Sequence, residues 1–190
     1  MSQGENMQAN IAIGLVETSS IAKGVETLDA MCKAAGVKPE IHLAISRGKY
    51  IIAVSGALGE VESAMSKGAE TAGNALVAKH VIRNIHAGAL AALNKRIKSG
   101  ITLEAVGIVE TKEALPALFA ADAAAKAAFV HVVEVNTGRG IGGKGYLTVT
   151  GEVGAVRTAV SAAVKAVGED AIVSRIVIPN AHEHVGEAIW

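Results

Sequence analysis

The sequence predicts an α+β protein made of two tandem copies of one split-βαβ domain, each a four-stranded antiparallel sheet with helices. The first observation is a repeat at an offset of 93 residues, because Gly14-Leu15-Val16-Glu17-Thr18 returns as Gly107-Ile108-Val109-Glu110-Thr111. The second is that later matches keep the order while the offset grows, pairing Gly48 with Gly143 and then His86 with His182. A period this long indicates a duplicated domain, because solenoid repeats span roughly 20–50 residues.

Each copy begins with a strand and a helix. A short aliphatic run ended by Glu-Thr predicts the strand, at 11–17 and again at 103–110. In the first copy Ile21, Val25, Leu28 and Cys32 recur at helical spacing, so we expect them to form the buried face, with Ser19 or Ser20 as the N-cap. In the second copy the comparable face holds Leu115, Leu118, Phe119 and Ala123, and Pro116 is tolerable only in the first helical turn.

The remaining elements also recur in the same order. Strands at 37–46 and 50–56, and at 130–137 and 146–151, flank glycine-containing turns and are predicted hairpins. A second helix follows, its apolar face formed by Val61, Met65, Ala69 and Ala72, or by Val153, Val156, Val160, Val164 and Val167. A last strand at 76–82 or 171–178 leads to a short helix near His86 or His182. This order is a split-βαβ arrangement, with domains at 10–97 and 101–190.

Composition narrows the class of protein. Hydrophobic residues make up 51% and aromatic residues 3%, so the core must consist of small aliphatic side chains, and we expect part of the apolar surface to be buried between subunits. Basic and acidic residues balance at 18 each, which gives no charge signature for nucleic acid or an anionic membrane. The single cysteine, Cys32, fits a reducing compartment and is expected in the core. No signal peptide or membrane span is predicted, so we expect a soluble intracellular protein.

Three strings in each copy carry a family resemblance. Ile13–Thr18, Asp29–Ala35 and Ile178–His182, with their counterparts, resemble the bacterial microcompartment (BMC) shell domain over nearly the whole chain. Ser20–Gly24 and Gly140–Lys144 make it similar to the trimeric tandem-domain PduT type. The resemblance implies a homotrimer imitating a hexamer, which assembles with other shell proteins in a cytoplasmic microcompartment. It also implies a structural, non-enzymatic role, with a central pore for small polar metabolites.

The resemblance assigns two hairpin loops to the pore. They contribute Ser46, Arg47 and Gly48 from the first copy, and Gly140, Ile141, Gly142 and Gly143 from the second. The second loop spells G-x-G-x-x-G, but a strand follows where a dinucleotide site needs a helix, so nucleotide binding is not predicted. An ordinary hairpin turn remains an alternative.

The same loops bear on cofactors. In PduT-like relatives a cysteine at the position of Ser46 holds an iron–sulfur cluster, and serine is a poor iron ligand, so we expect no cluster and no metal. Arg47 either attracts anions to the pore or points into solvent.

The resemblance also places Lys33 and Lys126 at the edge of the tile, where each would meet a neighbouring tile. The alternative is a lysine that interacts favourably with a helix carboxyl end. Asn84 and Asn180 stand where many relatives carry an edge arginine, so they complete the predicted edge without an arginine contact.

Other functions lack a matching set of residues. His182-Glu183-His184 is poor metal-ligand spacing on a helix, and His86 and His182 are expected to cap helices or lie in an interface. No nucleophile stands with a base, as an enzyme would require. The second candidate function is a trimeric small-molecule-binding sensor of ferredoxin-like fold, with a ligand held by the glycine loops.

Overall fold

The computed structural model describes residues 10–95, 97 and 104–185, which form two compact units. The first unit holds β1 (Ala12–Thr18), α1 (Ile21–Ala34), β2 (Lys38–Ala44), β3 (Tyr50–Gly56), α2 (Leu58–Ala72), the 3₁₀ turn η2 (Gly73–Ala75) and β4 (Leu76–Ile82). The second holds η1 (Ser46–Gly48), α3 (Ala87–Ala91), β5 (Ala105–Thr111), α4 (Pro116–Ala127), β6 (His131–Asn136), β7 (Gly145–Gly151), α5 (Val153–Val167), η3 (Glu169–Ala171) and β8 (Ile172–Ile178). Most of the predicted domain boundary, between 97 and 101, lies outside the described residues.

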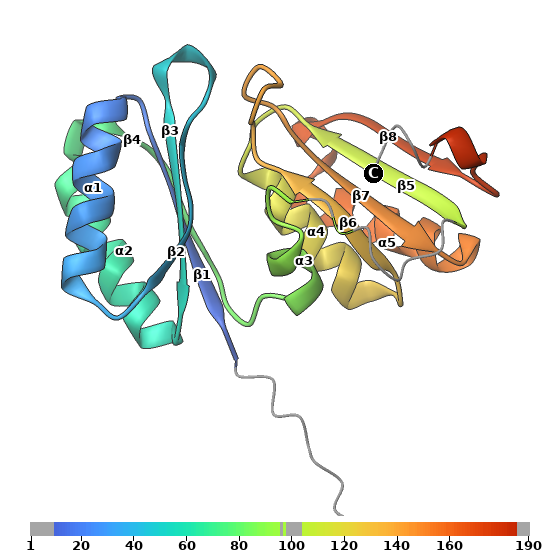
Figure 1. Ribbon diagram of the computed structural model, residues 1–190, viewed down its shortest axis with the longest axis horizontal. Helices are drawn as coiled ribbons and strands as arrows, with labels where there is room; N and C mark the ends of the chain where they lie inside the picture. The colour runs from blue at the N-terminus through green and yellow to red at the C-terminus, as the bar shows by residue number, and fades with distance from the viewer. Residues whose placement is uncertain (1–9, 96, 98–103, 186–190) are drawn as a thin grey trace, which may run out of the picture. The chain divides into compact units, whose positions relative to one another are not determined.

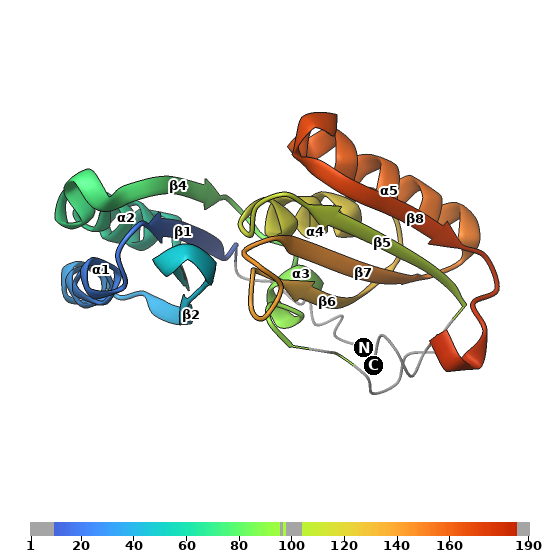
Figure 2. The same cartoon turned by 90° about the horizontal axis from the view of Figure 1, so that it is seen from above.

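Each unit contains one antiparallel sheet, with strand order β2-β3-β1-β4 in the first and β6-β7-β5-β8 in the second. The two sheets have the same register, because Val16 pairs with Ile52 and their counterparts Val109 and Leu147 also pair. Figure 1 shows both long helices of each unit on one face of its sheet, and Figure 2 gives the same arrangement from above. The predicted order of elements along the chain, the two hairpins and the split-βαβ fold are therefore confirmed.

Helix ends follow the expected chemistry. Ser20 caps α1 by accepting a hydrogen bond from the Lys23 backbone N–H, and Pro116 lies in the first turn of α4, as predicted. The core of the first unit joins apolar side chains of two strands and two helices, among them Val16, Ile52 and Val61. Its small aliphatic residues agree with the composition.

The predicted buried face of α1 is wrong. The helix buries Gly24, Thr27 and Met31, whereas Ile21 is 45% exposed, Val25 is 50% exposed and Cys32 is exposed; Leu28 is partly buried. Cys32 is therefore not a core residue. Gly24 faces the core, where the Tyr50 side chain fills the space beside it. A Cβ at this position would come within 2.6 Å of the Tyr50 ring, so the contact requires glycine.

The second copy makes the equivalent close contact with two small residues. Ala117 takes the place of Gly24, and Gly145 takes the place of Tyr50, where a Cβ would lie 2.7 Å from the Ala117 Cβ. Leu115 and Leu118 are buried as predicted, while Phe119 and Ala123 are only partly buried. Helix and strand therefore pack closely at this point in both copies, as in other close-packed interiors.

The segment that follows β4, residues 86–95 and 97, packs within the second unit, and we call it the α3 segment. Its first backbone N–H, that of His86, donates to the Asp122 carboxylate of α4 at 2.7 Å. Further along, it adds to the edge of β6, where the Asn94 N–H donates to the Val135 carbonyl at 2.7 Å and the Val135 N–H donates to the Ala92 carbonyl at 3.0 Å. The α3 segment therefore covers one end of α4 and the open edge of β6.

Candidate functional site

The two candidate pore loops both adopt turns that favour glycine. In η1 the backbone has φ 66° at Arg47 and 69° at Gly48. The second loop has positive φ at Gly138, Gly140, Gly142 and Gly143, between 73° and 91°. An L-residue with a side chain is disfavoured in this region, so the glycines are required by the turn itself, and Arg47 is held there at a conformational cost.

The two loops lie together within the second unit, to which Ile45–Gly48 belongs. A Cβ on Gly138 would lie 3.3 Å from the Ile45 Cγ2, and one on Gly143 would lie 3.8 Å from the Ser46 Cβ. Ser46, Arg47 and Gly48 are exposed, as are Gly140 and Gly142, while Ile141 and Gly143 are half-buried. The structure thus brings the predicted pore residues of both copies to one place.

Ion pairs neutralise the lysine at the base of each loop. Lys49 pairs with Glu17 at 2.7 Å, and the equivalent Lys144 pairs with Glu110 at 2.8 Å. Two arginines lie farther out, Arg47 in the first loop and Arg139 in the second, and both are exposed. Asn136 fixes the backbone at Arg139, because its Oδ1 accepts from the Arg139 N–H at 3.0 Å. Arg139 was not among the predicted pore residues, although its place in the same hairpin as Gly140 was the available signal.

The predicted edge residues occupy equivalent positions in the two copies. Lys33 and Lys126 lie in the last turns of α1 and α4, each 2.6 Å from an aspartate one turn earlier, Asp29 or Asp122. The side chain of Lys33 is 75% exposed and that of Lys126 is 41% exposed.

Asn84 and Asn180 are exposed in turns with φ of 52° and 48°. Asparagine is among the few residues that readily adopt this conformation, which gives a local reason for its presence in both copies.

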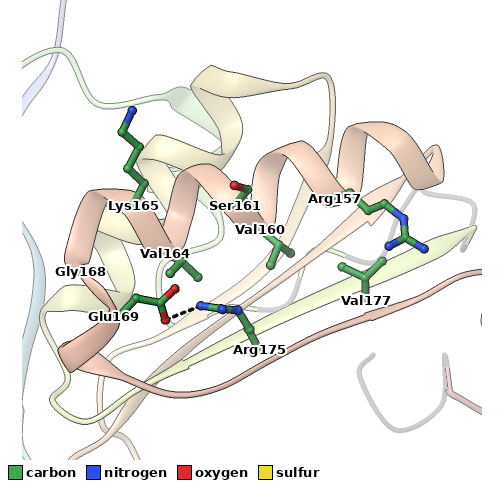
Figure 3. A pocket seen from close by; sticks show the side chains of 9 residues that line it. All are labelled: Arg157, Val160, Ser161, Val164, Lys165, Gly168, Glu169, Arg175 and Val177. Atoms are coloured by element: carbon green, nitrogen blue, oxygen red, sulfur yellow. Dashed lines mark hydrogen bonds and ion pairs between the residues drawn. The ribbon is translucent and has the colours of Figure 1, made fainter.

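A groove in the second unit runs between α5 and β8, with a volume of about 630 Å³ (Figure 3). Valines form part of its wall, and its charged residues are Arg157, Lys165, Arg175 and Glu169, of which the last two form an ion pair. A groove in the equivalent place on the first unit carries Glu62 where the second has Arg157.

Two of the histidines, His86 and His182, act as helix caps. His86 Nδ1 accepts from the Gly88 N–H at 3.1 Å, and His182 Nδ1 accepts from the His184 N–H at 3.3 Å, which confirms the predicted capping role. Among residues 10–95, 97 and 104–185, no three His, Cys, Asp or Glu side chains gather as metal ligands would. Within the same residues, every helix is too short or too polar to cross a bilayer.

Comparison with known proteins places the chain in a family. The BMC domain model matches residues 12–85 and 105–181. The bacterial microcompartment shell protein PduT of Citrobacter freundii is 43% identical over 173 residues, which cover 90% of this chain and 94% of that protein. The carboxysome shell protein CsoS1C of Halothiobacillus neapolitanus is 42% identical over 79 residues, 40% of this chain and 81% of its own length.

Solved structures agree with these relatives. A crystal structure of a microcompartment protein from Desulfitobacterium hafniense DCB superposes with a TM-score of 0.88 at 36% identity, covering 94% of this chain and 99% of the other. The fused permuted hexameric shell protein MSM0275 from the RMM microcompartment gives a TM-score of 0.63 at 25% identity, covering 84% and 85%. The comparisons give no support to the sensor alternative, and the named relatives are structural shell proteins. This chain belongs to the BMC domain family and is a tandem-domain shell protein of a bacterial microcompartment.

Proposed function

We propose that three copies of this chain close into a ring of six similar domains, a shell tile whose central pore passes small polar metabolites. Two similar domains in one chain allow a three-fold ring to imitate a six-fold one, because the contacts between successive domains repeat with small changes. Membership in a shell protein family that includes hexameric relatives supports this closure.

The observation that carries the pore is the meeting of the two hairpin loops within one unit. Loops from successive domains that lie side by side form a continuous rim when the ring closes. Glycines at Gly140, Gly142 and Gly143 allow chains to approach closely around an axis, because no Cβ obstructs them.

The charges at the rim favour anionic metabolites. Glu17 and Glu110 neutralise the inner lysines, so each protomer presents two exposed guanidinium groups, those of Arg47 and Arg139. Clefts lined by one sign of charge raise the local concentration of the opposite ion.

The test uses a thiol placed in the rim, in the variant Ser46→Cys with Cys32→Ser. We expect it to react faster with an anionic methanethiosulfonate than with a cationic one, relative to a free thiol, and added salt to reduce the difference. Adding Arg47→Gln should reduce the preference, and Lys67→Cys on the exposed face of α2 serves as the control position. Equal rates for both reagents, or a preference unchanged by Arg47→Gln, would contradict an anion-selective rim.

We further propose that the tile holds no iron–sulfur cluster, because Ser46 offers a neutral hydroxyl at the loop where the cluster ligand would stand. Protein purified without oxygen should contain neither iron nor labile sulfide in stoichiometric amounts. Finding both, together with charge-transfer absorption in the visible range, would refute this proposal.

A further inference from the structure

Equivalent faces of α1 and α4 differ sharply in exposure. Val25 is 50% exposed, whereas its counterpart Leu118 is fully buried. Ile21 and Cys32 are exposed, whereas their counterparts Ala114 and Ala125 are buried. The Asp29 side chain is 59% exposed and that of Asp122 only 12%, although each forms the same ion pair with a lysine. An apolar stripe with a carboxylate is thus covered in the second unit and open in the first.

In the second unit the α3 segment covers the end of this stripe that holds Asp122 and Ala125. It packs against α4, and its His86 N–H donates to the Asp122 carboxylate. Ala91 of this segment lies in the same pocket wall as Ala125, the counterpart of Cys32. Within the α3 segment itself, the most deeply buried side chains are those of Ala89, Ala92 and Leu93.

The chain carries a second copy of this cover after β8. The Ala181 N–H donates to the Glu104 carbonyl at 2.9 Å, just as the Ile85 N–H donates to the Ile11 carbonyl at 2.8 Å, so both segments leave their sheets in the same way. The same histidine cap then starts a turn of helix in both. The sequence continues the apolar pattern, with Val185, Ala188 and Ile189 at the positions of Ala89, Ala92 and Leu93.

We propose that the segment that begins at His182 of one protomer covers the Asp29 and Cys32 end of the α1 face of the next protomer, with the His182 backbone N–H donating to the Asp29 carboxylate. This inference rests on the proposed ring, because a closed ring places the first domain of the next protomer after the second domain of this one. The exposed stripe on α1 is then the receiving half of a contact between two copies of this chain. The repeat identifies the partner as a second copy of this chain. The α3 segment already packs on α4 inside each chain, and the segment after β8 and helix α1 are the repeat counterparts of these two elements.

A cross-link between native Cys32 and the variant Glu187→Cys tests the contact. Glu187 stands at the position of Ala91, so the two thiols should face each other across the protomer contact. Partial burial and the nearby Asp29 raise the pKa of the Cys32 thiol, so a short bismaleimide, which adds one thiol at each end, is used at mildly alkaline pH. We expect covalent trimers on a denaturing gel, and mixed products when two chains with different tags are expressed together.

Two controls locate the contact. Glu187→Cys combined with Cys32→Ser removes the receiving thiol, and Glu187→Cys combined with Cys32→Ser and Lys67→Cys moves it to α2; both should abolish the trimer ladder. Light scattering of the unmodified protein separates two kinds of failure. A trimer without the cross-link, or with links only inside single chains, overturns this inference and leaves the ring intact, whereas a monomer removes the ring itself.

Discussion

Removing the carboxylate of Asp122 or of Asp29 should have different consequences, although the two residues are equivalent in the repeat. Asp122→Ala leaves the His86 N–H without its acceptor at a site where the aspartate side chain is 12% exposed. Hydrogen bonds to charged groups contribute about 1.5–3 kcal/mol. A chain of this size loses about 2–4 °C in Tm per kcal/mol, so we expect Tm to fall by about 3–12 °C.

Asp29→Ala breaks only an exposed ion pair within the protomer, which contributes about 0–1 kcal/mol. If Asp29 accepts the His182 N–H of a neighbour, each lost contact of 1.5–3 kcal/mol weakens self-association by about 10- to 150-fold. Stability that comes from association depends on protein concentration.

The assay is therefore thermal unfolding at a series of chain concentrations, with sedimentation velocity alongside. The loss in Asp122→Ala should be present at every concentration, and the loss in Asp29→Ala should appear only where the wild-type protein associates. The reasoning is refuted if Asp29→Ala destabilises the dissociated chain as much as Asp122→Ala does. It is equally refuted if Asp29→Ala leaves the association constant unchanged.

Three further predictions concern packing, pH and assembly. Gly107→Ala places a Cβ 2.7 and 2.8 Å from two stiff valine side chains, so we expect a loss of about 1–3 kcal/mol in urea unfolding; Gly14→Ala meets a flexible methionine and should cost less, and equal losses would contradict this. Hydrogen bonds from the Gly154 and Ala155 N–H groups lower the pKa of the Glu152 carboxyl, so its contribution to stability is present above the ordinary value of 4.5 and lost as pH falls through the lowered pKa. The Tm difference between wild type and Glu152→Gln should therefore shrink on acidification, and a constant difference would argue against the cap. Lys33→Asp should leave the trimer intact in light scattering while reducing sheet formation in electron micrographs, because the side chain is 75% exposed; dissociated trimers would place it inside the ring instead.

The repeat made the fold predictable, because each element had to be consistent with two sequences. The strand that starts at Ala12 and its counterpart at Ala105 were recognised from the same Glu-Thr ending, and both pair as expected. Pro116 could be placed in the first helical turn because proline is tolerated there. Local chemistry and periodicity sufficed for these features.

The face of α1 could not be predicted, because helical periodicity identifies an apolar stripe without saying what covers it. Ile21, Val25 and Cys32 form such a stripe, but the core side of the helix is set by the fit of Gly24 against Tyr50. That fit depends on residues 26 positions apart in the sequence, on different elements. The apolar stripe on α1 was therefore expected to face the core of its own domain. In the first unit it is exposed, and the proposed ring would cover it.

Residues of the candidate site were predicted unevenly for a similar reason. The glycines of the second loop indicated a turn by themselves, and their positive φ angles agree with it. The neutralisation of Lys49 by Glu17 needs β1 to pair with β3, two strands that are not consecutive in the sequence, so sequence spacing gave no sign of it. The recurrence of His86 as His182 was the available hint to the α3 segment, and only its hydrogen bond to Asp122 revealed what it covers.

Negative-stain electron microscopy of the purified protein at raised concentration tests the central claim most directly. Three chains in a closed ring predict six-lobed discs with a stain-filled centre, joined edge to edge into sheets. A field of small particles without six-lobed symmetry, remaining separate at every concentration, would contradict the shell tile.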